Sequence, residues 1–344
     1  MKLLIIGGTR FLGRHLVTSA LARNHNVTLF NRGNHALETA AVETIEGDRH
    51  TDLHKLKGRR WDAVVDTCGH LPRAVRAAAE VLSNSVNRYV FISSQNAYAN
   101  VSVPNITEDY PLGTLTSEQL DQANAIGTEG QPSYGALYGG LKALCEEAAQ
   151  QMMPGRVLIL RPGLIVGPYD YSDRFTYWVV RVAGGGEVLA PGRPGRFIQF
   201  IDARDLAEWT IRMIEREAAG AYNVHGRPNA LTMQGLLEEC KLASNSDARF
   251  VWASEEFLLR EGVAAWSEMP LWLPEEAAPH LKGFMFIDPS KAIADGLQFR
   301  PLRETISDTL AWYQASDVNE PLKAGFKSDK ERSLLDKVHS HQDS

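Results

Sequence analysis

The stretch that decides the fold is residues 3–16, LLIIGGTRFLGRHL. Its apolar run ends at two glycines, and a helical pattern begins at Phe11. A strand that passes through a glycine turn into a helix brings free backbone N–H groups and the positive end of the helix dipole to one point, which suits a pyrophosphate. A dinucleotide-binding turn usually has three spaced glycines, whereas here Gly7 and Gly13 flank Arg10. Taken alone, the stretch predicts either a modified nucleotide site or an ordinary tight turn.

The same alternation continues along the chain. Apolar strands are expected at 27–30, 42–45, 62–66, 89–93 and 157–161, with helical patterns between them. Continuous apolar strands that alternate with helices predict an α/β fold, a doubly wound parallel (Rossmann) sheet with both faces covered.

The pattern loosens after the last of these strands, which predicts two domains. We expect a nucleotide-binding domain from 1–163 plus about 200–222, and a smaller α/β substrate-binding lobe from about 164–199 and 223–315. The charged segment 318–344 lacks periodicity and is expected to be a flexible tail. The polar stretch 99–133 is too long for an ordinary connection and predicts a functional loop or a lid.

Composition limits the possible partners and compartments. The formal net charge of −6 argues against a nonspecific nucleic-acid binder. Three cysteines without metal-ligand or disulfide spacing predict no metal site and a reducing compartment. The sequence has no run near the ~18 apolar residues of a membrane span. We therefore expect a soluble, cytoplasmic protein with a small-molecule substrate and no membrane or nucleic-acid partner, and leave a homodimer open.

The ends of the second and third strands indicate which dinucleotide binds. An acid at the end of the second strand favours NAD, and an arginine there accommodates the 2′-phosphate of NADP. This strand ends FNRGN, with Arg32 and no acid, which favours NADP over NAD. The third strand ends EGDR, where Asp48 can accept a hydrogen bond from the adenine amino group. Arg32 as a solvated turn residue and Asp48 as a turn former are the alternatives.

The main catalytic signal is SYGALYGGLKALCEE, 133–147. Tyr138 and Lys142 are four residues apart and share one helix face. A neighbouring ammonium lowers the pKa of a phenol, which can then exchange a proton with a carbonyl or alcohol oxygen. Ser93 and Ser94 lie at the carboxyl end of the fifth strand, where a hydroxyl can hold the substrate oxygen. Tyr134 lacks a lysine four residues on and is interpreted as a packing residue or an edge of the substrate site.

With the turn, Ser94, Tyr138 and Lys142 in this order, the chain resembles an extended or atypical short-chain dehydrogenase/reductase of the NAD-dependent epimerase/dehydratase superfamily. The likeness includes RPGLIVGP at 161–168, FIDARDLAE at 200–208 and AYNV at 221–224. It implies catalysis by Ser94, Tyr138 and Lys142. Motifs and resemblance together predict a cofactor site from Gly7, Thr9, Arg10, Phe11, Leu12, Gly13, Asn31, Arg32, Asp48, Arg49, Thr67, Cys68, Gly69, Ser93, Lys142, Pro162, Gly163 and Ile165.

Two departures from the family pattern bear on the reaction. Arg10 in place of the middle glycine resembles an atypical branch of reductase-like and RNA-binding relatives. Gln95 and Asn96 follow Ser94 where dehydratases of the family have an acid pair. We expect an NADP(H)-dependent oxidoreductase acting on a carbonyl or alcohol. The alternatives are a redox-neutral epimerase of a sugar or nucleotide sugar, and a non-catalytic nucleotide-sensing or RNA-binding relative.

Overall fold

A seven-stranded parallel sheet forms the centre of the structure, a computed structural model that describes all residues except 36, 38–41, 128–130, 317–320 and 343–344. Its strands are β1 (Lys2–Ile6), β2 (Asn26–Asn31), β3 (Glu43–Glu46), β4 (Ala63–Asp66), β5 (Arg88–Ile92), β6 (Val157–Pro162) and β10 (Gly220–Val224). They lie in the order β3-β2-β1-β4-β5-β6-β10. In β1, Ile5 is in register with Leu29 of β2 and Val65 of β4. The predicted doubly wound α/β sheet is confirmed.

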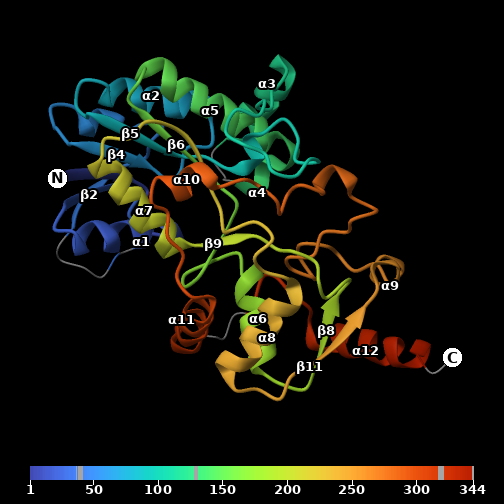
Figure 1. Cartoon of the computed structure of the whole chain (residues 1–344). Helices are drawn as coiled ribbons and strands as arrows, with labels where there is room; N and C mark the ends of the chain where they lie inside the picture. Colours follow the sequence, from blue (N-terminus) through green and yellow to red (C-terminus); the bar gives the residue numbers. More distant parts are fainter. Residues whose placement is uncertain (36, 38–41, 128–130, 317–320, 343–344) are drawn as a thin grey trace.

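Helices cover both faces of this sheet (Figure 1). The helices α1 (Phe11–Ala22) and α7 (Ala203–Glu215) pack on one face, and α2 (Pro72–Leu82) and α5 (Tyr138–Met152) pack on the other. In β1, Leu3 and Ile5 join the core with α1, whereas Leu4 and Ile6 join the core with α2. Successive side chains of a strand point to opposite faces, so a strand buried on both faces is apolar throughout.

A C-terminal lobe lies beyond the junction of β7 (Leu164–Val166) with β9 (Phe200–Asp202). Its two-stranded parallel sheet pairs β8 (Glu187–Pro191) with β11 (Arg249–Ala253). Its helices are α6 (Arg174–Ala183), α8 (Met233–Ser244), α9 (Glu255–Arg260) and α11 (Leu302–Ala315). Trp178 and Trp272 are almost fully buried in this core. By contrast, Ala292 of α10 (Ser290–Ala294) and Leu297 pack in the core of the central sheet.

The polar stretch 99–133 contains two helices, α3 (Ser117–Ile126) and α4 (Gln131–Tyr134). Thr116 begins α3 with a capping box, because its Oγ1 accepts from the N–H of Gln119 and the Gln119 side chain accepts from the N–H of Thr116. Ala123 and Tyr134 are buried in a small cluster with Leu141 of α5. This cluster fastens the stretch beside α5. Residues 128–130, within the predicted loop or lid, lie outside the described residues.

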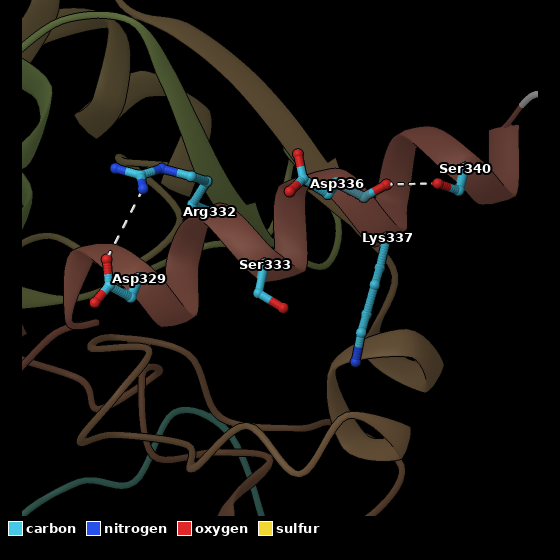
Figure 2. A pocket seen from close by; sticks show the side chains of 6 residues that line it. All are labelled: Asp329, Arg332, Ser333, Asp336, Lys337 and Ser340. Carbon is cyan, nitrogen blue, oxygen red and sulfur yellow. Dashed lines mark hydrogen bonds and ion pairs between the residues drawn. The ribbon is translucent and has the colours of Figure 1, made fainter.

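The chain ends in a helix, α12 (Ser328–Gln342), which packs against β8. Leu334, Leu335 and Val338 are buried in the C-terminal lobe, and Glu331 pairs with Arg181 at 2.7 Å. Figure 2 shows the polar side chains of this helix, including an Asp329–Arg332 pair. The prediction of a flexible tail over 318–344 is therefore wrong for 328–342. Three apolar side chains are too few to give a helical pattern in the sequence, yet they suffice against a preformed apolar surface. Residues 318–320 and 343–344 of that tail lie outside the described residues.

Among the described residues, no helix combines the length and the apolar character needed to cross a bilayer.

Candidate active site

The carboxyl ends of the parallel strands meet at one edge of the sheet, and the predicted catalytic residues lie there. Ser94 lies two residues after the end of β5 and begins a short 3-10 helix, Gln95–Ala97, by accepting a hydrogen bond from the N–H of Asn96 at 3.2 Å. Tyr138 is the first residue of α5. The Ser94 hydroxyl lies close enough to the Tyr138 phenol to lower its pKa. The structure thus brings together the two hydroxyls that the sequence predicts to act on one substrate oxygen.

The pKa of Tyr138 is raised above its usual range because the phenol is shielded from solvent, and the nearby Ser94 hydroxyl only partly offsets this effect. The sequence predicted the opposite direction, with Lys142 lowering the pKa. The ammonium of Lys142 instead donates to the carbonyls of Gly69, at 2.8 Å, and Ile92, at 2.7 Å. Tyr138 is therefore a protonated phenol at neutral pH, ready to act as an acid.

Lys142 is 2% exposed and lies 4.1 Å from the centre of the Phe91 ring. Burial lowers the pKa of Lys142. The two carbonyl bonds fix the ammonium at the ends of β4 and β5, and they use two of its three donors. The third donor remains for a ligand at this edge.

A buried polar network lies under the two hydroxyls. Glu146 accepts hydrogen bonds from Ser93 and from the Arg161 guanidinium, whose Nη2 lies 2.7 Å from Glu146 Oε2. Arg161 also donates to the Tyr98 hydroxyl at 3.1 Å, and that hydroxyl donates to Asn223 at 2.7 Å. This network ties α5 to β5, β6 and β10. Ser93, predicted to contact the cofactor, is a member of this network, because its hydroxyl is directed at Glu146.

The glycine turn after β1 has the conformation that a pyrophosphate site needs. Gly7 and Gly8 have positive φ values of 97° and 85°. A Cβ on Gly13 would lie 2.5 Å from Gly8 Cα, so this helix can approach the turn only with glycine at that position. Thr9, Arg10, Phe11 and Leu12 follow the turn. The N–H of Gly13 donates to Arg10 O at 2.8 Å, whereas the N–H groups of Phe11 and Leu12 have no backbone acceptor among the described residues.

Several of the other predicted cofactor residues lie at the carboxyl-end edge of the sheet. Thr67 and Cys68 follow β4, and Thr67 Oγ1 donates to Ile6 O at 2.8 Å beside the glycine turn. The edge also includes Asn31, which donates to Gly7 O at 3.4 Å. Pro162, Gly163 and Ile165 lie at the end of β6 and just after it, and Ile165 is half-buried. A Cβ on Gly163 would lie 2.5 Å from the His225 ring, so this position has no room for a side chain.

Three charged residues among the predicted cofactor contacts have different surroundings. Arg49 is buried and makes a two-pronged ion pair with Asp66, at 2.7 and 2.9 Å, so its guanidinium is already engaged within the protein. Asp48 accepts from the N–H of His50 at 2.8 Å, as a turn former does. Arg32 is exposed, with no hydrogen bond or ion pair to any described residue.

Two polar side chains at the site were missed from the sequence. The ring of His70 lies 6.4 Å from that of Tyr138, and burial lowers the pKa of His70 to about 3. His70 Nδ1 and Gln95 Oε1 are buried without a hydrogen-bond partner among the described residues. Such atoms in a native fold call for a partner from a ligand or water. Their positions directly after Gly69 and Ser94 were the only sequence signal.

A doubly wound sheet, a glycine turn after its first strand and a Tyr–Lys pair beside a strand-end serine define an NAD(P)-dependent enzyme of the short-chain dehydrogenase/reductase superfamily. A profile of the NAD dependent epimerase/dehydratase family matches residues 3–224, and the chain belongs to this family.

Known relatives are distant. The chain is 24% identical over 268 residues to the chloroplast stem-loop binding protein of 41 kDa b of Arabidopsis thaliana. This alignment covers 70% of this chain and 63% of that protein. It is 28% identical over 204 residues to 2-alkyl-3-oxoalkanoate reductase of Stenotrophomonas maltophilia, over 54% of this chain and 59% of that protein. The chain thus matches less than two thirds of the length of either relative.

Among solved structures, UDP-N-acetylglucosamine 4-epimerase from Bacillus cereus superposes with a TM-score of 0.66. The identity is 16%, and the superposition covers 94% of this chain and 99% of that one. At this identity the likeness is one of fold.

Proposed function

We propose that the protein is an NADP(H)-dependent oxidoreductase that interconverts a carbonyl and an alcohol. The observation that carries this proposal is the proximity of the Ser94 and Tyr138 hydroxyls, with Lys142 fixed one helical turn further along the same helix. A hydroxyl pair of this kind can polarise one substrate oxygen and exchange a proton with it.

The residues present fit a nicotinamide dinucleotide. The left-handed Gly7 and Gly8 and the close approach at Gly13 form a turn that accepts a diphosphate. From there the strand ends lead to Lys142 and Tyr138, and the unpartnered Gln95 Oε1 faces Gly163. The dinucleotide, when bound, supplies or accepts the hydride.

In reduction, Tyr138 donates its proton to the substrate oxygen as that oxygen becomes negative. Ser94 donates a second hydrogen bond to the same oxygen and fixes its position. Lys142 uses its free donor to hold the ribose hydroxyls. Since burial keeps Tyr138 protonated, the residue is prepared for reduction, and in the reverse reaction the phenol must first lose its proton to solvent before it can accept one from the alcohol.

The preference for NADP rests on arginines around the glycine turn. Arg10 and Arg14 line a cavity beside it, and Arg32 is exposed at the end of β2. No acid stands at the end of β2 to pair with a 2′-hydroxyl, as NAD-specific sites require.

Redox-neutral epimerisation of a sugar uses the same proton-transfer group and is the second candidate. The likeness in fold to a sugar-nucleotide epimerase supports it. An epimerase keeps its dinucleotide through the reaction cycle, whereas a reductase must exchange it.

The test has two steps. The purified protein is denatured and the released nucleotide is identified by mass, and the protein is then assayed for NADPH and NADH oxidation with a panel of aldehydes and ketones. Exchange with free NADPH and its carbonyl-dependent oxidation are expected. A tightly retained NAD that never exchanges favours epimerisation, and failure to bind either nucleotide contradicts both.

A further inference from the structure

Arg174, the first residue of α6, is half-buried and has no ion pair. Its Nε donates to the carbonyl of Trp266 at 3.3 Å. Among the described residues, no carboxylate pairs with its guanidinium, and neither Nη1 nor Nη2 has a hydrogen-bond acceptor. Burial lowers the pKa of Arg174, because the charge is partly removed from water and the nearby Asp170 does not fully offset the loss.

Two other half-buried arginines of the C-terminal lobe have glutamate partners. Arg181 Nε lies 2.7 Å from a carboxylate oxygen of Glu331, and Arg196 Nε lies 3.7 Å from one of Glu275. A charge that is withdrawn from water normally has such a partner, since the desolvation is otherwise not offset. Arg174 differs from both arginines, and its two free nitrogens can bind an acceptor from outside the chain.

Trp266 holds the Arg174 guanidinium in a fixed orientation. Arg174 Cζ lies 5.4 Å from the centre of the Trp266 ring, within the range of a cation–π contact. Phe284 packs edge to face on the same ring, with ring centres 5.4 Å apart. The backbone of Trp266 has a positive φ of 66°, which is strained for a bulky residue. In this conformation one residue supplies both the ring and the carbonyl that orient Arg174.

Tyr171 connects Arg174 to the predicted catalytic residues. It is exposed, lies three residues before Arg174 on the loop between β7 and α6, and its ring centre is 6.3 Å from that of Phe11 at the glycine turn. The Tyr171 phenol is near enough to raise the pKa of both Tyr138 and Arg174. Tyr138 and Arg174 are therefore within reach of one small molecule.

The charges around Arg174 favour a ligand with a single negative charge. Its free Nη1 and Nη2 can donate two parallel hydrogen bonds, which fit the two oxygens of a carboxylate. Asp170 is buried nearby and accepts from the N–H and hydroxyl of Ser172, at 2.8 and 3.0 Å. Among the described residues, no lysine or second arginine acts on Arg174. A diphosphate would bring several negative charges beside Asp170 with one cation to balance them.

We propose that Arg174 binds a carboxylate of the substrate, so that the protein acts on an oxo acid. The reacting carbonyl lies at Ser94 and Tyr138, and the carboxylate lies at Nη1 and Nη2 of Arg174. We call Arg174 and Trp266 the carboxylate site. The place of the carbonyl rests on the proposed function, whereas the carboxylate site rests on the contacts of Arg174. Arg174 determines specificity and takes no part in proton transfer.

The experiment compares oxo acids with their methyl esters, which lack the negative charge. The acids are pyruvate, acetoacetate, 4-oxopentanoate and 5-oxohexanoate, in which the carboxylate lies progressively further from the carbonyl. Each acid, each ester and inorganic pyrophosphate is titrated calorimetrically at about pH 7.5, where the carboxylic acids are ionised. The protein is used with saturating NADP and, in a second series, without nucleotide.

The variants are Arg174→Gln and Arg174→Lys. Arg196→Gln is the matched control, because Arg196 is half-buried in the same lobe but is paired with Glu275. Thermal unfolding of each variant shows whether it is folded. If Arg174→Gln does not fold, Arg174→Lys decides, because it keeps the charge and loses only the paired donors of the guanidinium.

We expect at least one acid to bind about tenfold or more tightly than its ester, and Arg174→Gln to remove this preference. Arg174→Lys should reduce it about threefold, and Arg196→Gln should leave it unchanged. The carboxylate site is overturned if no acid binds more tightly than its ester, if the preference is unchanged in both Arg174 variants, or if Arg196→Gln loses it equally. Pyrophosphate that binds more tightly than every acid and depends on Arg174 also overturns the assignment to a carboxylate.

The two proposals fail differently. If NADPH is not oxidised with any of these carbonyl compounds but an acid binds through Arg174, the proposed function fails and the carboxylate site stands. If acids and esters are reduced with equal kcat/KM by the wild-type protein and by Arg174→Gln, the proposed function stands and the carboxylate site fails.

Discussion

Two regions of the molecule hold positive charge by opposite means. Under the hydroxyls of Ser94 and Tyr138, Lys142 and Arg161 are buried, and every bond that fixes them is internal, to carbonyls, to the Tyr98 hydroxyl or to Glu146. In the cavity beside the glycine turn, Arg10 and Arg14 lie against the faces of two exposed tyrosines, Tyr171 and Tyr169, and no described residue accepts a hydrogen bond from their side chains.

The difference separates structure from recognition. A buried charge that loses its partner destabilises the fold, because desolvation is no longer offset. A stacked surface arginine can be replaced with little effect on folding, because solvent already surrounds it. Substitutions in the first region should therefore change the free energy of unfolding, and those in the second should change ligand affinity.

The largest expected effect is on stability, from Arg161→Met. The change leaves the Glu146 carboxylate buried and unpaired, which should cost about 3–5 kcal/mol in the free energy of unfolding. Urea denaturation measures it. The matched control is Arg59→Met, because Arg59 pairs with Glu43 at the surface, where a loss of about 0–1 kcal/mol is expected. Similar small losses from both variants would contradict the contrast.

A smaller loss of stability is expected when the pH is lowered. His225 is buried beside the network, with Nε2 3.1 Å from Arg161 O, and burial lowers its pKa to about 3. The folded-state pKa lies below the unfolded value near 6.5, so protons favour the unfolded chain, and stability falls as pH drops below about 6.5. Between about pH 7.5 and pH 5 the loss attributable to His225 should be about 2 kcal/mol.

Urea midpoints at the two pH values measure this loss. In His225→Gln the decrease on acidification should shrink by a comparable amount. A pH dependence identical to that of the wild-type protein would remove His225 as its source.

The smallest effect concerns the cavity beside the glycine turn, which Arg10 and Arg14 line. Tyr171→Leu removes the ring under Arg10 and should weaken NADPH about two- to fivefold, the value of an exposed cation–π contact. Stability should change by no more than about 0.5 kcal/mol. Tyr171→Phe keeps the ring and should bind NADPH like the wild-type protein. Fluorescence titration distinguishes the two, and equal behaviour of both variants would argue against stacking as the support for Arg10.

The central sheet could be predicted because both of its faces are buried. In β1 every residue from Leu3 to Ile6 enters a core, so the strand appears as a plain apolar run. The helix α12 could not be predicted in this way, because Leu334, Leu335 and Val338 are buried against residues such as those of β8, more than a hundred positions earlier in the chain. The spacing of apolar residues within one segment does not reveal such long-range contacts.

The site shows the same limit. Ser94, Tyr138 and Lys142 follow local rules, the end of a strand and one helix face, and the structure brings them to one edge. The ion pair of Arg49 with Asp66 could not be predicted, because Asp66 is on β4 and meets Arg49 only through the fold. The direction of the Tyr138 pKa shift also depends on tertiary burial, which spacing in a helix does not reveal.

The most direct test of the proposed chemistry compares the wild-type protein with Tyr138→Phe for NADPH binding and for carbonyl-dependent NADPH oxidation. We predict equal affinity for NADPH and a loss of turnover of about a hundred- to ten-thousandfold, because only the proton donor is removed. Tyr134→Phe, one turn earlier, should keep most of the activity. Full turnover in Tyr138→Phe would contradict the assignment of Tyr138 as the proton donor.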